Sequence, residues 1–174
     1  MPMQSTEKKA EARIRELGIL IPELPKPLGA YVPFVRTGSL VYISGMLPFK
    51  EGKLLMTGRV GDEVSLDDAV VCARTAAINT LAVLKAATGS LDKVRRCVKI
   101  SGFVSSAEGF FDQPKVINGA SDFMVEVFGE AGRHARAAVG VHALPLNAPV
   151  EIEFIFEVED IALEKGGAGL PSSA

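Results

Sequence analysis

Arg136 is the residue of this sequence with the clearest capacity for chemistry. It stands where a predicted strand begins, next to the small residues Ala135, Ala137, Ala138 and Gly140. Small neighbours leave room around a guanidinium, whose planar fork of N–H groups pairs with both oxygens of a carboxylate. The plainer interpretation is an edge arginine in water, and composition alone favours it. At this level the carboxylate clamp is a hypothesis.

Glu151 is the second candidate, because it begins a predicted strand directly after a proline-bounded loop. Further along, Glu153 and Glu157 share its side of the strand in alternation with apolar residues, and we interpret these two as a solvated face. Arg136 and Glu151 flank one predicted β-hairpin, so we expect their strand ends to lie apart within a chain. An interface between two subunits is where they could still share a pocket.

Four more residues bear on these candidates. Asn118 lies off the apolar stripe of its predicted helix, where asparagine is a poor helix former, although an exposed position would also explain it. Tyr31 follows a Gly-Ala turn and offers a hydroxyl donor, or simple packing in a core or interface. His134 and His142 lie near Arg136, but a metal would need a third ligand from elsewhere, so we expect no metal site and interpret both as surface or core residues.

Familiar catalytic motifs are missing from the sequence. It contains no glycine-rich phosphate loop with a following Lys-Ser/Thr, no HExxH, no CxxC and no serine nucleophile elbow. Cys72 and Cys97 have no metal-ligand spacing, and we expect two buried free thiols in a reduced cytosol, with a disulfide as the alternative. The chemistry therefore has to come from the arginine, the glutamate and the polar residues around them.

Length and charge exclude several classes of protein. The chain has 174 residues, 48% of them hydrophobic, which suits one globular domain with a core. A formal net charge of -2 and the absence of a basic run disfavour nucleic acid or an anionic membrane as the main partner. We expect a cytoplasmic protein, because the N-terminus has no apolar stretch of signal-peptide type and no apolar run reaches membrane-span length.

Hydrophobic periodicity and turn residues predict where the elements lie. We expect residues 1–26 to form an N-terminal helix and a proline-rich connector, residues 27–160 to form the main domain, and residues 161–174 to form a flexible tail. Ser65 with Asp68 resembles a capping box, Gly89 ends the same helix, and Pro114 suits the first turn of another. The predicted helices are Ser5–Leu17 (capped by Ser5 or Thr6), Leu66–Ala87 and Pro114–Phe128, and the predicted strands are Val32–Val35, Leu40–Ser44, Val94–Val104, Arg136–His142 and Val150–Val158.

The element order β-β-α-β-α-β-β predicts an α/β (α+β) domain with one sheet and two long helices on one face. The strand around residues 40–43 is apolar on both faces, and two helices cover only one of them. The other face then needs a partner, and the economical partner is another copy of the chain.

Several segments together resemble the RidA/YjgF family. Gly29-Ala30-Tyr31 and the strand ending Ser44-Gly45 are similar to its opening motifs, and Asn118 stands at the expected place in the second long helix. The most specific segment runs from Ala135 to Glu153 and is similar to the family pattern A-R-[ST]-x-V-x-V-x-x-L-P-x-x-A-x-V-E-I-E, with the same spacing from arginine to glutamate. The resemblance covers roughly Pro27 to Val158.

This resemblance implies a chorismate-mutase-like fold with a mixed sheet, and a homotrimer with clefts between subunits. It also implies hydrolysis of reactive 2-aminoacrylate-type enamines and imines to 2-keto acids and ammonia, without a cofactor. Arg136 is then the residue that binds the carboxylate of the 2-imino or 2-keto acid, and Glu151 the residue that handles water. The remaining pocket residues implied by the family are Tyr31, Ser44, Gly45, Asn118 and Ala138.

The sequence departs from the family at two pocket positions. Met46 replaces a frequent glutamine, and Ala138 replaces a frequent cysteine, which together with the N-terminal extension indicates a divergent subgroup. Two alternatives stay open: a regulatory trimer that binds small carboxylates without turnover, and the endoribonuclease of the L-PSP type that gives the family its other label. The acidic net charge and the missing basic patch argue against the endoribonuclease.

Overall fold

The order of elements in the computed structural model, which describes residues 9–24 and 31–160, agrees with the predicted order. The helices and strands are α1 (Ala10–Glu16), β1 (Phe34–Thr37), β2 (Leu40–Met46), β3 (Phe49–Lys50), β4 (Lys53–Leu54), α2 (Leu66–Thr88), η1 (Leu91–Lys93), β5 (Val94–Ser105), α3 (Gln113–Phe128), η2 (Gly129–Gly132), β6 (Ala135–Val141), η3 (Pro145–Asn147) and β7 (Val150–Val158). The predicted β-β-α-β-α-β-β core is confirmed; the predicted cap at Ser5 or Thr6 and the tail over 161–174 lie outside the described residues.

The main sheet has the strand order β1-β2-β7-β5-β6. Strands β5 and β6 are parallel, whereas β7 pairs antiparallel with both β2 and β5, so the sheet is mixed as predicted. The predicted hairpin between the last two strands is wrong, because β5 lies between β6 and β7. The helical crossover through α3 returns the chain parallel to β5 on one side, and β7 then pairs with β5 on the other.

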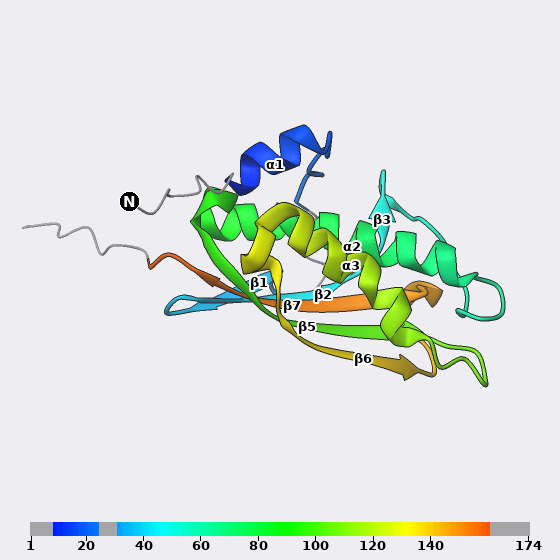
Figure 1. The fold of residues 1–174 in the computed structure, drawn as a ribbon. Coiled ribbons are helices and arrows are strands. Elements are labelled where there is room, and N and C mark those ends of the chain that lie inside the picture. Colours follow the sequence, from blue (N-terminus) through cyan, green and yellow to red (C-terminus); the bar gives the residue numbers. More distant parts are fainter. Residues whose placement is uncertain (1–8, 25–30, 161–174) are drawn as a thin grey trace, which may run out of the picture.

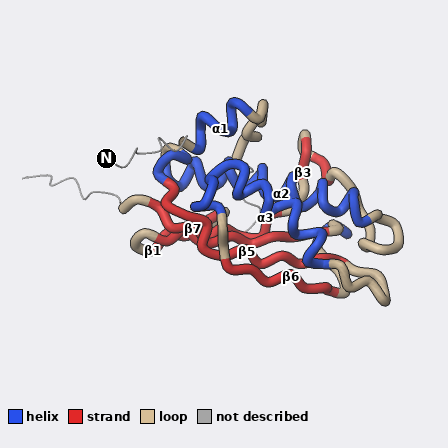
Figure 2. Tube along the Cα trace, viewed as in Figure 1, coloured by secondary structure: helices blue, strands red, loops and turns tan. Residues whose placement is uncertain are grey.

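Helices α2 and α3 cover one face of this sheet, and α1 packs outside them (Figure 1). Along β7 the side chains of Ile152, Phe154 and Phe156 point toward the helices and are buried, while those of Glu151 and Glu153 point the other way. No described helix covers that second face, which we call the free face (Figure 2). The prediction of two long helices on one face is therefore confirmed.

The ends of α2 are set by residues that the sequence had marked. The Ser65 hydroxyl accepts a hydrogen bond from the backbone N–H of Asp68 at 3.1 Å, and Gly89 ends the helix with a φ of 76°. By length and composition α2 could cross a membrane, but 61% of its apolar window is buried here, as in the core helices of soluble proteins. The buried amide of Asn79 in this helix donates to the carbonyls of Leu47 and Phe49.

These bonds from Asn79 attach a short hairpin, β3–β4, that the periodicity did not predict. Its turn contains Glu51 and Gly52, both with positive φ (52° and 79°). Strands of two residues are too short to show an alternating pattern, so only the Glu-Gly turn signals them.

Helix α1 attaches to the domain through one buried face and one acidic residue. Ile14 is buried, and the Glu11 carboxylate accepts hydrogen bonds from the Ser90 hydroxyl and the backbone N–H of Leu91. These contacts lower the pKa of Glu11 against the opposing effect of its burial. The N-terminal helix thus packs on the main domain, at the loop that follows α2.

Candidate functional site

Arg136 lies on the edge strand β6 and points to the helix-covered side of the sheet. Its backbone pairs with that of Ile100, which is buried under the helices. Its Nη1 donates to Oδ1 of Asn118 at 2.8 Å and to Oγ of Ser121 at 3.1 Å, both on α3. The structure therefore brings together Arg136 and Asn118, two residues that the sequence had selected separately.

Ser121 and His134 complete this group, and the sequence analysis had missed their role. His134 Nε2 lies 2.9 Å from the Ser121 hydroxyl, and its Nδ1 lies 2.7 Å from the carbonyl oxygen of Gly132. Their sequence spacing could have indicated this role, because Ser121 is one helical turn after Asn118 and His134 is two residues before Arg136, the spacings that place residues on one side of a helix and of a strand. We call Asn118, Ser121, His134 and Arg136 the Arg136 cluster.

Glu151 occupies a different environment, at the start of β7 on the free face, opposite Phe103 of β5. It is partly buried and packs against Gly45, where an added Cβ would overlap the Glu151 carboxylate. Burial raises the pKa of Glu151, and the negative charge of Glu153 raises it further. We call Ser44, Gly45 and Glu151 the Glu151 cluster.

The two clusters do not meet within one chain. Arg136 is on the helix-covered side of the sheet and Glu151 on the free face, and β5 separates their strands. Two strand spacings alone place their backbones roughly 9–10 Å apart. Arg136 and Glu151 thus lie apart within a chain, as predicted, although through an intervening strand and not across a hairpin.

The remaining predicted residues distribute between these two places. The Ser44 hydroxyl donates to the carbonyl of Val32 at 2.7 Å, next to Tyr31, whose side chain is 59% exposed. Ala138 follows Arg136 by two residues on the same side of β6 and pairs with Gly102. Ala138 therefore lies beside the Arg136 cluster, and Tyr31 precedes Val32, whose carbonyl binds Ser44 of the Glu151 cluster.

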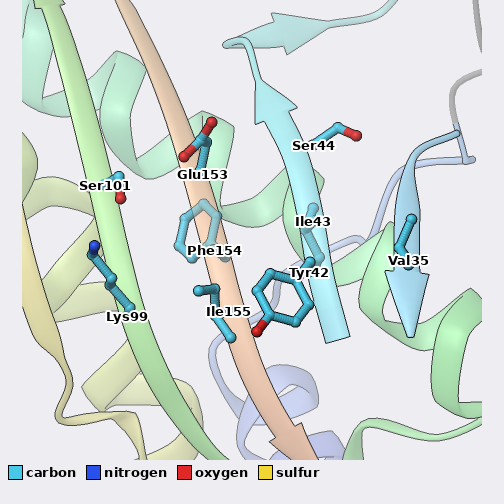
Figure 3. Close-up of a pocket in the computed structure, with 9 residues that line it drawn as sticks. All are labelled: Val35, Tyr42, Ile43, Ser44, Lys99, Ser101, Glu153, Phe154 and Ile155. Carbon is cyan, nitrogen blue, oxygen red and sulfur yellow. The ribbon is translucent and has the colours of Figure 1, made fainter. Parts of the chain in front are cut away.

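The free face carries a pocket of about 300 Å³ (Figure 3). Its lining includes Ser44 of the Glu151 cluster and no member of the Arg136 cluster. Two of its lining residues, Val35 and Tyr42, are 56% and 42% exposed. Its lining residues come from β1, β2, β5 and β7 and are Val35, Tyr42, Ile43, Ser44, Lys99, Ser101, Glu153, Phe154 and Ile155.

Among the residues that the structure describes, neither the cysteines nor the metal-binding residue types form a reactive site. Cys72 and Cys97 are buried free thiols, as predicted, and burial raises the pKa of Cys97 to about 12. A thiol with such a pKa is a poor nucleophile at neutral pH. Within residues 9–24 and 31–160, no three His, Cys, Asp or Glu side chains gather as metal ligands would. The absence of a metal stays a prediction.

Comparison with known proteins finds a family model and relatives that match most of the chain. A family model described as "YjgF/chorismate_mutase-like, putative endoribonuclease" matches residues 11–158. Protein TCP17 of Trypanosoma cruzi is 39% identical over 153 residues, which cover 87% of this chain and 96% of TCP17. The 2-iminobutanoate/2-iminopropanoate deaminase of Dermatophagoides farinae is 34% identical over 142 residues, covering 81% of this chain and 95% of the deaminase.

Solved structures share the fold across most of their length. A crystal structure of a protein of unknown function from Agrobacterium tumefaciens, 48% identical, matches with a TM-score of 0.81 over 86% of this chain and 92% of that one. Escherichia coli TdcF with bound serine is 26% identical and matches with a TM-score of 0.60 over 79% of this chain and 94% of TdcF.

Proposed function

Because the chain belongs to the YjgF/RidA family, we propose that it hydrolyses reactive enamines and imines of the 2-aminoacrylate type to 2-keto acids and ammonia. The family contains a deaminase of this kind, and TdcF binds serine, a small molecule with a carboxylate. The proposal assigns the substrate's carboxylate to Arg136 and the attacking water to Glu151.

The observation that carries this proposal is the state of the Arg136 guanidinium. Both protons of Nη1 are engaged by Asn118 and Ser121, whereas within the described residues Nε and Nη2 have no hydrogen-bond partner. The side chain is exposed, so these N–H groups are accessible. Two adjacent donors on a fixed plane match the two oxygens of a carboxylate, and such a charge-assisted contact is worth about 1.5–3 kcal/mol.

Glu151 supplies the proton chemistry in this proposal. The carbon of an imine is already electrophilic, so water needs orientation and removal of one proton rather than a strong nucleophile. Glu151 takes that proton as the C–O bond forms and returns it to the imine nitrogen, which gives the neutral carbinolamine. The carbinolamine hydroxyl then passes its proton to the nitrogen as the C–N bond breaks, which releases ammonia and leaves the 2-keto acid. A carboxylate with a raised pKa is a better base than an ordinary one and suits this task.

The two clusters could act in one reaction if they came from different copies of the chain. We propose that three copies pack through their free faces, so that the Arg136 cluster of one copy faces the Glu151 cluster of the next. The exposed Val35 and Tyr42 on the free face support a protein partner there, and an edge strand carrying Arg136 lies at the border of that face.

Turnover is tested by coupling the protein to a threonine dehydratase and following the release of 2-oxobutanoate. We expect Glu151→Gln to lower kcat by about 10²–10⁴-fold, because the general base is lost. Arg136→Ala should instead raise KM by roughly tenfold to a hundredfold, the loss of one charge-assisted contact. Calorimetry with 2-oxobutanoate gives the affinity directly for each variant.

Glu157→Gln is the matched control, since Glu157 lies on the same strand and the same side as Glu151 but pairs with Arg96 at 3.2 Å. It should leave both kinetic constants unchanged. If the wild-type protein releases 2-oxobutanoate no faster than buffer yet binds it, the regulatory alternative holds and the deaminase proposal is rejected.

A further inference from the structure

A chain of hydrogen bonds leads from Arg136 into the protein and ends on a backbone carbonyl. It runs from Nη1 of Arg136 to the Ser121 hydroxyl (3.1 Å), from there to His134 Nε2 (2.9 Å), and from His134 Nδ1 to the Gly132 oxygen (2.7 Å). It links α3, β6 and the turn between η2 and β6. The proposed reaction does not account for Ser121 or His134, so their role needs its own explanation.

With a neutral His134, only one arrangement of protons satisfies every contact along this hydrogen-bond chain. A guanidinium donates and never accepts, and a carbonyl oxygen accepts and never donates. His134 therefore donates from Nδ1 to Gly132, and Ser121 accepts from Arg136 and donates its own proton to Nε2 of His134. Partial burial lowers the pKa of His134, and the charge of Arg136 adds to this, although the hydrogen bond to Gly132 acts in the opposite direction. The pKa is lowered on balance, so a neutral ring with an Nε2 lone pair is favoured at neutral pH.

The end of the chain is fixed by close backbone packing. A Cβ on Gly132 would overlap the backbone carbonyl of Met124 in α3, so the turn approaches the helix as closely as a glycine permits. The Gly132 carbonyl, which accepts the hydrogen bond from His134, is consequently held in place by the packing of η2 on α3. Along this series of hydrogen bonds, the Gly132 carbonyl orients His134, His134 orients Ser121, and Ser121 orients the Arg136 guanidinium.

We propose that Ser121 and His134 are positioning residues that orient Arg136 for its ligand. Asn118 and Ser121 accept both protons of Nη1, and His134 holds Ser121, which leaves the Nε–Nη2 edge as the pair of donors that a carboxylate meets. A free arginine samples many rotamers, and holding it in one saves the entropy that binding would otherwise cost. The inference rests on the proposed carboxylate site and specifies which edge of Arg136 binds and what holds it.

The tautomer of His134 is the first test, and it needs no ligand. Long-range ¹H–¹⁵N spectra of the ¹⁵N-labelled protein at pH 7 should show His134 protonated at Nδ1 and unprotonated at Nε2. The chain has only one other histidine, His142, which is exposed, so a His142→Gln variant assigns the signals. A proton on Nε2 would overturn the proposal, because Ser121 would then have no acceptor in the ring.

Binding of 2-oxobutanoate, followed by calorimetry, is the second test. Ser121→Ala and His134→Ala should each weaken binding roughly three- to tenfold, the cost of ordering one long side chain. In the coupled assay KM should rise with little change in kcat. Ser121→Thr keeps the hydroxyl and should restore wild-type affinity, which loss of packing alone does not explain.

An arginine-to-lysine background separates positioning from general stability. Lysine presents a point charge without a fork, so Ser121→Ala should add no further loss of affinity to Arg136→Lys. Equal affinity of the wild type and Ser121→Ala, or a full extra loss in the lysine background, would overturn the proposal. A protein that binds the keto acid through Ser121 but turns over no imine would refute only the deaminase function, and one that fails to bind would refute both.

Discussion

The Arg136 cluster and the Glu151 cluster differ in how much of each is built within one chain. Around Arg136, two side chains of α3 hold the guanidinium, and a histidine anchored on the backbone supports one of them. Around Glu151, the neighbours are a glycine and a second, repelling carboxylate, on a sheet face that no described helix covers. The proposed carboxylate-binding group is thus held entirely by residues of one protomer, whereas the proposed water-activating group has few partners there.

This difference suggests that the two parts of the proposed reaction, substrate binding and hydrolysis, have different structural requirements. An arginine fixed by its own chain is ready for a carboxylate as soon as the protomer folds. A glutamate whose burial already disfavours its charge works best where an interface excludes further water and brings the substrate to it. Binding without turnover is therefore expected of a single chain, and turnover only of an assembly.

Replacing Tyr42 with arginine should break the assembly and give the largest effect. Tyr42 is 42% exposed on the free face, and a charge there would be buried without a partner in the proposed interface. We expect monomers in sedimentation velocity and a kcat as low as in Glu151→Gln. Affinity for 2-oxobutanoate should fall much less, because the Arg136 cluster lies within one chain.

Phe49→Arg provides the control for that variant. Phe49 is an aromatic residue of similar exposure, 38%, but it lies on β3, outside the main sheet. It should leave both assembly and turnover unchanged. A Tyr42→Arg protein that is monomeric and fully active would show that the two clusters do not need each other.

Replacing Gly45 with alanine should impair the Glu151 cluster without destabilising the fold. The added Cβ would displace the Glu151 carboxylate, a flexible side chain that can move aside. We expect Gly45→Ala to lower kcat about tenfold to a hundredfold, as misplacement of a catalytic group does, with little change in the urea midpoint.

Gly119→Ala is the contrasting variant. There the added Cβ would overlap the backbone carbonyl of Val70 in α2, which cannot move without separating the two helices. It should cost about 1–3 kcal/mol of the free energy of unfolding, as overpacking does. If Gly45→Ala behaved in the same way, the role of Gly45 would be packing and not the placement of Glu151.

The sequence was sufficient to predict the layers of the fold, and it selected Arg136, Asn118 and Glu151 as candidate site residues. Helical and strand periodicity report burial, so the covered face of β7 and the apolar stripe of α3 were readable in the chain. Strand pairing is not periodic, and for that reason the position of β5 between β6 and β7 was missed. Which residues contact Arg136 depends on that pairing.

The contacts of His134 likewise could not be predicted from the sequence pattern. In the sequence it is one of two histidines near Arg136, and nothing in the pattern distinguishes it from His142. The structure separates them, because the packing of Gly132 against α3 gives His134 an acceptor and a serine, while His142 is exposed. Tertiary packing, and not residue type, decides which of them supports the arginine.

The pH dependence of turnover offers the finest comparison, because Glu151 responds to both its burial and its neighbour. Both raise its pKa, burial more than the charge of Glu153. A general base works when ionised, so kcat/KM should fall as the pH drops through the pKa of Glu151, at a higher pH than for an ordinary glutamate. Glu153→Gln removes one of the two causes and should move this acid limb to lower pH, without bringing it to the ordinary value. Glu157→Gln should leave the limb in place, and an unmoved limb in Glu153→Gln would assign the whole shift to burial.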